Sequence, residues 1–182
     1  MPRADLLIFD TSPLSHFARE NWLGALKAVV GERTAVIPDV VVDELKRGLA
    51  HNSFLQAVLD APWIGRRDLQ SPEEIERFGY YSSLLVAGER NRGEAGVLAL
   101  AATTGGTAVV DDMAGRTAAQ RDGLPLTGTV GLMMQAIHSG LLTVALASAI
   151  ADDLLSGQYR LPFGPGGFAE FAEQNGLTGP MP

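Results

Sequence analysis

Short apolar runs alternate with longer amphipathic stretches along this chain. Leu6–Phe9 is a continuous apolar run with a charged residue on each side, which is typical of a strand buried on both faces of a parallel sheet. Residues 34–37 and 107–110 predict two further strands, and residues 124–126 predict a brief one. Because helical patterns separate these strands, we expect an α/β fold: a three-layer α/β/α sandwich around a central, mainly parallel sheet.

Start and stop signals mark the helices between the strands. Thr11-Ser12-Pro13 supplies an N-cap and a first-turn proline for a helix through Phe17, and Ser71-Pro72-Glu73-Glu74 has the form of a capping box that opens a helix toward Val86. Thr127 or Thr129 is expected to cap another helix. Further helices are predicted at residues 22–30, 38–48, 93–104, 113–121 and 142–155.

The end of the chain differs from the rest in composition. Glycine and proline are frequent from Gly157 onward, so only residues 168–174 are expected to be ordered as helix there. We therefore predict one domain over residues 1–156 and a partly ordered Gly/Pro-rich C-terminal extension over residues 157–182.

The composition is that of a globular protein and narrows the possible chemistry. Hydrophobic residues make up 46% of the 182 positions and charged residues 19%. Cysteine is absent, which excludes disulfides, thiolate metal sites and cysteine nucleophiles. The first apolar run ends at Asp10, far short of a signal-peptide core, and Pro125 and several glycines divide the uncharged segment 123–151. We expect a cytoplasmic protein that does not enter the membrane.

Four acidic residues carry the candidate chemistry. Asp10 and Asp112 follow apolar strands, and Glu44 and Glu94 lie near the beginnings of helices. Each alone could be a helix cap or a surface ion-pair partner, so the prediction depends on their combination. The carboxyl ends of parallel strands share one edge of the sheet, where these side chains can converge. Clustered carboxylates repel one another unless a cation neutralises them, and oxygen ligands alone favour Mg²⁺ or Mn²⁺ over zinc. Such an ion can activate water for phosphodiester hydrolysis.

Short motifs with a fixed order and spacing surround these acids. They are IFDTSPL at 8–14, IPDVVVDEL at 37–45, NRGEA at 91–95, VVDD at 109–112 followed by Arg116, and TGTVGL at 127–132. In this order the motifs resemble those of the PIN-domain family, and in particular its VapC-like branch, over about residues 6–142.

The resemblance implies a metal-dependent ribonuclease with an acidic active site. The catalytic residues it implies are Asp10, Glu44, Glu94 and Asp112. The metal ligands for Mg²⁺ or Mn²⁺ are Asp10, Asp112, Glu94 and Asp111, although side chains alternate along a strand, so only one of the two adjacent aspartates should face the site. The residues that would position substrate or water are Thr11, Ser12, Thr129 and Arg116. VapC-like proteins are toxins, so the resemblance also implies an RNA substrate, a small antitoxin partner and a homodimer.

Other interpretations stay open. A PIN fold can serve as a binding module with weak or no turnover. A strand that ends in Asp-Thr is also typical of haloacid-dehalogenase-like phosphatases, but these need a second carboxylate where this chain has Ser12. The net charge of −7 disfavours binding to a polyanion unless arginines cluster locally or divalent ions contribute. The candidate clusters are Arg66 with Arg67, Arg90 with Arg92, and Arg116 with Arg121. The histidines His16, His51 and His138 are isolated and are expected to be surface or core residues.

Overall fold

The computed structural model describes residues 5–85 and 91–177. The strands are β1 (Leu6–Phe9), β2 (Thr34–Pro38), β3 (Ile64–Arg67), β4 (Thr107–Val109) and β5 (Leu126–Thr127). The helices are α1 (Thr11–Arg19), α2 (Leu23–Val30), α3 (Asp39–Gly48), α4 (Leu55–Leu59), α5 (Pro72–Leu85), α6 (Arg92–Thr104), α7 (Met113–Arg121), α8 (Thr129–His138), α9 (Val144–Ser156) and α10 (Phe168–Ala172), which η2 (Glu173–Leu177) continues across a kink.

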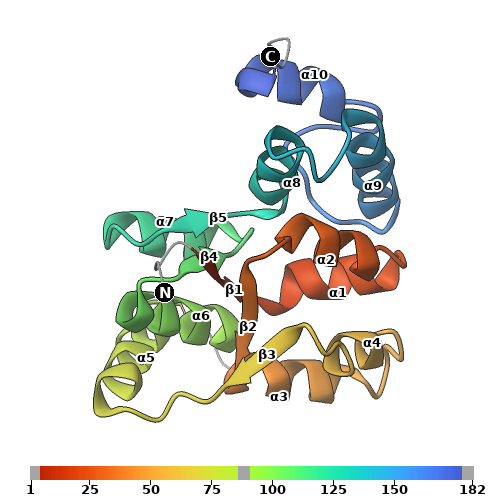
Figure 1. Cartoon of the computed structure of the whole chain (residues 1–182). Coiled ribbons are helices and arrows are strands. Elements are labelled where there is room, and N and C mark those ends of the chain that lie inside the picture. The colour runs from red at the N-terminus through yellow and green to blue at the C-terminus, as the bar shows by residue number, and fades with distance from the viewer. Residues whose placement is uncertain (1–4, 86–90, 178–182) are drawn as a thin grey trace.

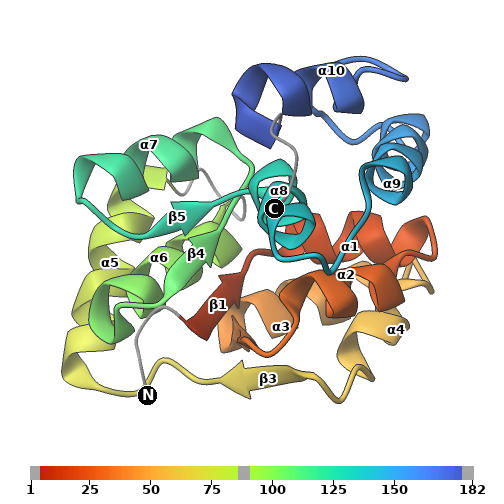
Figure 2. The ribbon, with the colours of Figure 1, turned by 45° about the horizontal axis from the view of Figure 1, so that its top comes forward.

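The five strands form one parallel sheet in the order β3-β2-β1-β4-β5, with β1 at its centre. Helices α5 and α6 lie on one side of the sheet, and α1 and α2 lie on the other (Figure 1). In the turned view, α7 lies with α5 on the first side and α8 with α2 on the second (Figure 2). The predicted α/β architecture with a central parallel sheet is therefore confirmed.

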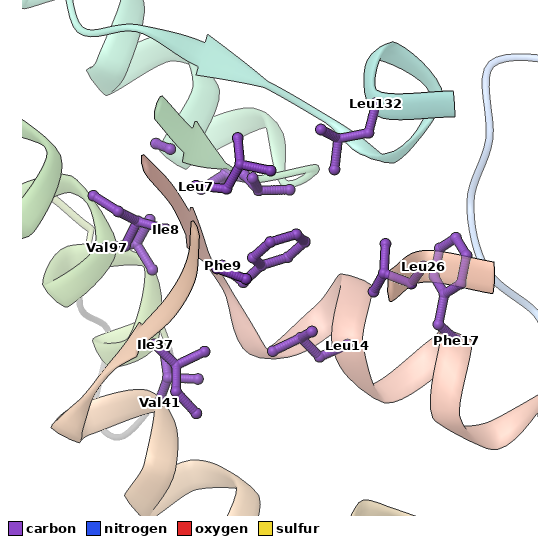
Figure 3. Packing of buried hydrophobic residues seen from close by; sticks show 14 of the residues in the cluster. Leu7, Ile8, Phe9, Leu14, Phe17, Leu26, Ile37, Val41, Val97 and Leu132 are labelled. Atoms are coloured by element: carbon purple, nitrogen blue, oxygen red, sulfur yellow. The ribbon is translucent and has the colours of Figure 1, made fainter. Parts of the chain in front are cut away.

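The central strand forms the middle of the core because its side chains alternate between the two layers. Ile8 lies beside Val97 of α6, whereas Phe9 turns to the other side, toward Leu14 and Leu26 (Figure 3). Helix α6 is buried from Gly93 through Ala101 and has no polar face, as expected for a helix enclosed by other elements. This helix begins at the carboxyl edge of the sheet, where its first turn meets the ends of the strands.

Most predicted elements are found close to their expected bounds. The β1, β2 and β4 strands and α7 agree with the prediction to within a residue. The capping box also forms, since Ser71 Oγ accepts from the Glu74 N–H and Glu74 accepts from the Ser71 N–H, at 3.1 and 2.9 Å. Val86 and Arg90 lie outside the described residues.

Several predictions at the remaining elements are wrong. Neither Thr127 nor Thr129 caps α8, because the N-cap is Gly128 in an extended conformation and Thr129 is the first helical residue. The β5 strand begins at Leu126, two residues later than predicted, and α4 and β3 were not predicted.

Within 5–85 and 91–177 no helix is long and apolar enough to cross a membrane. Tyr159 and Phe168 pack into the core, and the division at residue 156 stays a prediction.

Candidate active site

The end of β1 places Asp10 at the centre of the carboxyl edge. Its backbone N–H donates to the Val109 carbonyl of the neighbouring strand at 3.1 Å, so the sheet pairing holds the residue in place. Its side chain is buried and caps α1 by accepting from the Ser12 N–H at 3.4 Å. The Asp10 carboxylate therefore caps α1 and also lies at the candidate site.

Glu44 and Glu94 approach Asp10 from α3 and α6. Glu44 accepts hydrogen bonds from Thr11 Oγ1 at 2.6 Å and from the Gly93 N–H at 2.8 Å. A Cβ atom at Gly93 would lie 2.6 Å from Glu44 Oε2 and 3.0 Å from Asp10 Oδ1. A side chain at residue 93 would therefore displace the Glu44 carboxylate from the first turn of α6.

Asp10 and Glu94 are the two buried acids of this edge, and their ionisation is strongly perturbed. Burial raises the pKa of Asp10 to about 7, and the charges of Glu44 and Asp111 add to the rise. Burial also raises the pKa of Glu94 to about 8, with further contributions from Asp10, Asp112 and Glu44. Glu94 Oε2 is buried and accepts no hydrogen bond from residues 5–85 or 91–177. A cation beside these two carboxylates would relieve both the repulsion and the unsatisfied oxygen.

Asp111 is fixed by hydrogen bonds from two other parts of the chain. It accepts from the N–H and the Oγ1 of Thr129, at 2.9 and 2.6 Å, and from the hydroxyl of Tyr159. A Cβ atom at Gly128 would collide with Asp111 Oδ1, so a side chain there would displace this carboxylate. Arg116 lies nearby and donates to the Val110 carbonyl at 3.1 Å. Thr129 thus holds a carboxylate of the site instead of capping α8.

Asp112 occupies a different position from its neighbour. It is exposed, and it caps α7 by accepting from the Ala114 N–H at 2.8 Å. Its charge contributes to the raised pKa of Glu94, whereas the charge of Asp111 contributes to that of Asp10. Both adjacent aspartates therefore lie at the edge, each near a different buried acid.

Two adjoining hollows open at this edge. The first has a volume of 340 Å³ and is lined by Asp10, Thr11, Ser12, Ser15, His16, Glu44, Asn91 and Glu94. The second has a volume of 420 Å³, and its walls include Asp111, Asp112, Tyr159 and Arg160. Ser12 and His16 line both hollows, so the two form neighbouring compartments of one surface.

The comparison with protein families agrees with this geometry. A family model described as a PIN domain matches residues 6–163, which is most of the chain. The chain belongs to the PIN-domain family. The PIN domain is a nuclease-type fold, and PIN-domain nucleases generally use divalent metal ions. No curated protein matches the chain.

The donor set of this PIN domain consists of carboxylate oxygens, which suits Mg²⁺ or Mn²⁺. Within the described ranges, however, no three Asp, Glu or His side chains are grouped closely enough to hold an ion. Hydrogen bonds account for this, because Glu44, Asp111 and Asp112 are each turned toward donors of the protein itself. Glu94 Oε2, by contrast, could bind an ion without breaking a hydrogen bond to the described residues.

Two residues of the PIN-domain site were missed or undervalued from the sequence. Tyr159 belongs to the Gly/Pro-rich region, 48 positions from Asp111, and no local pattern could have indicated their contact. His16 was taken for a surface or core residue, but it lines both hollows and its ring lies on that of Tyr159, with centroids 4.3 Å apart. Its spacing from Asp10, nearly two turns along α1, is the only sequence signal that could have pointed to it.

The arginines expected to offset the acidic charge are mostly held by the protein. Arg66 donates to the Leu59 carbonyl at 2.7 Å, and Arg67 pairs with Glu74 at 3.2 Å, both on the edge strand β3. Arg121 pairs with Asp122 at 3.1 Å. These three arginines are therefore engaged within the protein and do not form a free basic cluster.

Proposed function

We propose that this PIN domain is a metal-dependent endoribonuclease that hydrolyses RNA phosphodiester bonds at the hollow around Asp10 and Glu94. The observation that carries the proposal is the pair of buried carboxylates with raised pKa values, one of which has an oxygen without a partner. Two buried carboxylates lower the stability of the fold in the absence of a cation. A functional role at this position explains why they are buried together.

Asp10, Glu94 and Asp112 would hold Mg²⁺ or Mn²⁺, with Asp111 adjoining them. A bound ion would supply an activated water and neutralise charge on the phosphate during hydrolysis. Glu44 keeps the site together, since it joins Thr11 of α1 to the first turn of α6. Ser12 lines both hollows, where its hydroxyl can orient a water or a phosphate oxygen.

The decisive comparison is between the wild type and Asp10→Asn. We expect purified wild-type protein to cleave RNA with Mg²⁺ or Mn²⁺ and to stop when a chelator is added. Asp10→Asn keeps the shape of the side chain and an oxygen for the helix cap, so it should fold normally and lose cleavage. Cleavage by Asp10→Asn in chelator at the wild-type rate would refute the mechanism.

A second candidate function is a PIN-fold binding module with weak or no turnover. The observation that favours it is the engagement of Glu44, Asp111 and Asp112 by donors of the protein, which leaves no ready group of three metal ligands in the described part of the chain. Protein that binds Mn²⁺ and RNA but leaves the RNA intact would establish this alternative.

The biological setting is part of the same proposal and rests on the likeness to VapC-like proteins. In this setting the protein is the cytoplasmic, homodimeric toxin of a toxin-antitoxin pair. Expression of the wild type alone should then arrest growth, and expression of Asp10→Asn should not. Normal growth at equal amounts of both proteins would argue for a stand-alone RNA-processing enzyme.

A further inference from the structure

The turn that follows α9 brings Tyr159 to the carboxyl edge of the sheet. The Tyr159 N–H donates to the Leu154 carbonyl and the Gln158 N–H donates to the Leu155 carbonyl, both at 2.9 Å. This pair of hydrogen bonds ends a helix through one left-handed residue, a position that glycine usually fills. Here Gln158 occupies it with a φ of +63°, which is unfavourable for a residue with a side chain. Contacts of the following residues must therefore offset the cost of this turn.

The side chain of Tyr159 contacts two other parts of the site. It is 7% exposed, and its ring lies on that of His16 in α1, with centroids 4.3 Å apart and a tilt of 32°. Its hydroxyl donates to Asp111, which follows β4, and lies 3.2 Å from Thr129 Oγ1. Because burial and the ring contact hold the phenol in place, its hydroxyl has a defined position beside Asp111.

The two oxygens of Asp111 differ in the hydrogen bonds that they accept. Oδ2 accepts from the hydroxyls of Thr129 and Tyr159, whereas Oδ1 accepts from the Thr129 N–H. An ionised carboxylate has about four acceptor positions, about two on each oxygen. Donors of the protein therefore fill Oδ2, and Oδ1 keeps the capacity to bind a water or an ion.

Asp111 lies where its charge can act on an ion beside Asp10. The two aspartates follow the neighbouring strands β4 and β1, and the charge of Asp111 contributes to the raised pKa of Asp10. Asp111 and Tyr159 line the second hollow, which shares Ser12 and His16 with the hollow of Asp10. Hydrogen bonds from surrounding residues orient the carboxylates of metal sites, and their loss commonly weakens ion binding by about 10–100-fold. The Tyr159 hydroxyl makes a hydrogen bond of this kind.

A second buried tyrosine provides an internal comparison. Tyr81 of α5 is 1% exposed, and its hydroxyl donates to Asp122 at 2.9 Å. Asp122 follows the last residue of α7, whereas Asp112 precedes the first, so the length of the helix separates this hydrogen bond from the acids of the site. Tyr81 and Tyr159 thus share burial and an aspartate acceptor, but only the acceptor of Tyr159 belongs to the site.

We propose that Tyr159 is a positioning residue of the PIN-domain site: its hydroxyl keeps Asp111 in the orientation in which this carboxylate contributes to ion binding at Asp10. In this role Tyr159 touches neither the ion nor the substrate and acts through Asp111. The proposal rests on the proposed metal-dependent function and extends the site to the turn beyond α9.

The test measures Mn²⁺ binding by the full-length protein without RNA, from the electron paramagnetic resonance signal of free Mn²⁺ in titrations up to millimolar concentrations. Tyr159→Phe removes the hydroxyl and keeps the ring on His16. Tyr81→Phe is the matched control, because it removes a buried hydroxyl that donates to an aspartate outside the site. Asp111→Asn, alone and together with Tyr159→Phe, completes a double-mutant cycle that measures the coupling between the two residues.

We expect Tyr159→Phe to weaken Mn²⁺ binding by about tenfold and Tyr81→Phe to change it by less than about twofold. Asp111→Asn should weaken binding at least as much as Tyr159→Phe. In protein that already carries Asp111→Asn, Tyr159→Phe should change binding by less than about twofold, because the residue through which it acts is lost. In chelator both tyrosine variants should melt about 2–4 °C below the wild type, so lost stability does not explain the difference in ion binding.

The outcomes separate this proposal from the proposed function. If Tyr159→Phe binds Mn²⁺ like Tyr81→Phe, if Asp111→Asn binds it like the wild type, or if Tyr159→Phe weakens binding equally with and without Asp111→Asn, the positioning role is refuted, and the ribonuclease stands when the wild type cleaves RNA. Tighter binding by Tyr159→Phe would also overturn the role, because the hydroxyl would then compete with the ion for Asp111. If the wild type shows the expected coupling but leaves RNA intact, the positioning role stands and the ribonuclease fails. If the wild type binds no Mn²⁺, both proposals fail together.

Discussion

Gly93 gives the most direct test of the packing at the candidate site. It lies in the first turn of α6, and its N–H donates to Glu44 Oε1 at 2.8 Å. A Cβ atom added there would lie 2.6 Å from Glu44 Oε2 and 3.0 Å from Asp10 Oδ1, both well inside ordinary van der Waals separation. Gly93→Ala must therefore displace the Glu44 carboxylate or the start of the helix.

The cost of this displacement can be worked out from the bonds of Glu44. A hydrogen bond to a charged group contributes about 1.5–3 kcal/mol, and Glu44 accepts one from Thr11 and one from Gly93. Alanine favours a helix over glycine by about 1 kcal/mol, which offsets part of the loss. If one bond breaks, Gly93→Ala should lower the free energy of unfolding by about 0.5–2 kcal/mol, or the melting temperature by about 1–8 °C. A carboxylate misplaced by about 1 Å should reduce RNA cleavage about 100-fold.

Gly79→Ala and Gly24→Ala are the matched controls. Both glycines lie in helices, α5 and α2, and a Cβ atom at either would meet no atom within 4 Å. These variants should keep wild-type cleavage and match or exceed wild-type stability in urea unfolding by up to about 1 kcal/mol. If Gly93→Ala unfolds at the same urea concentration as Gly79→Ala and cleaves RNA at the wild-type rate, the inferred packing of Glu44 and Asp10 against α6 is wrong.

Three further predictions follow from the charges and caps. The pKa of Glu94 is raised from 4.5 to about 8, so between these pH values the folded state holds a proton that the unfolded chain loses. In chelator, the free energy of unfolding should therefore fall as the pH rises from 4.5 toward 8. Urea titrations should show a smaller fall for Glu94→Gln. Mn²⁺ at about 100 times its Kd should raise the free energy of unfolding of the wild type by about 2.7 kcal/mol, and thereby its melting temperature. The melting temperature of Asp10→Asn should rise much less. Ser71→Ala removes the cap of α5 and should cost about 1 kcal/mol in urea unfolding without changing cleavage, and a cost near zero would contradict the capping box.

The strands and helices that the sequence predicted are those with a strong local signal. The β1 and β2 strands are short, continuous apolar runs, and α7 lies between an aspartate cap and a turn at Asp122. The β3 strand lacks such a signal, since only Ile64 of its four residues is buried and Gly65 follows it. It is an edge strand that is held by pairing with β2, which a single sequence does not reveal.

Long-range contacts explain what the sequence could not predict at the site. Strand order places Asp10 beside the end of β4, as expected for carboxyl ends of parallel strands. Thr129 does not cap α8 as predicted: it is the first helical residue, and Asp111, 18 positions away, accepts its N–H and its hydroxyl. Tyr159 reaches the same carboxylate from beyond α9, so neither contact leaves a periodic pattern in the sequence.

The two adjacent aspartates are unequal in a way that sequence adjacency conceals. Asp111 accepts three hydrogen bonds, and each contributes about 1 kcal/mol or more, so it can act only from the position in which Thr129 and Tyr159 hold it. Asp112 is exposed and holds one cap bond, whose loss costs about 1 kcal/mol. If an ion bound beside Asp10 and Glu94, Asp111 would stay in its present position. Asp112 would have to give up its hydrogen bond at the α7 cap to bind the ion. Burial, more than mutual repulsion, raises the pKa values of Asp10 and Glu94, so both charged forms are unfavourable without a cation. A cation that stabilised both charged carboxylates would favour that exchange.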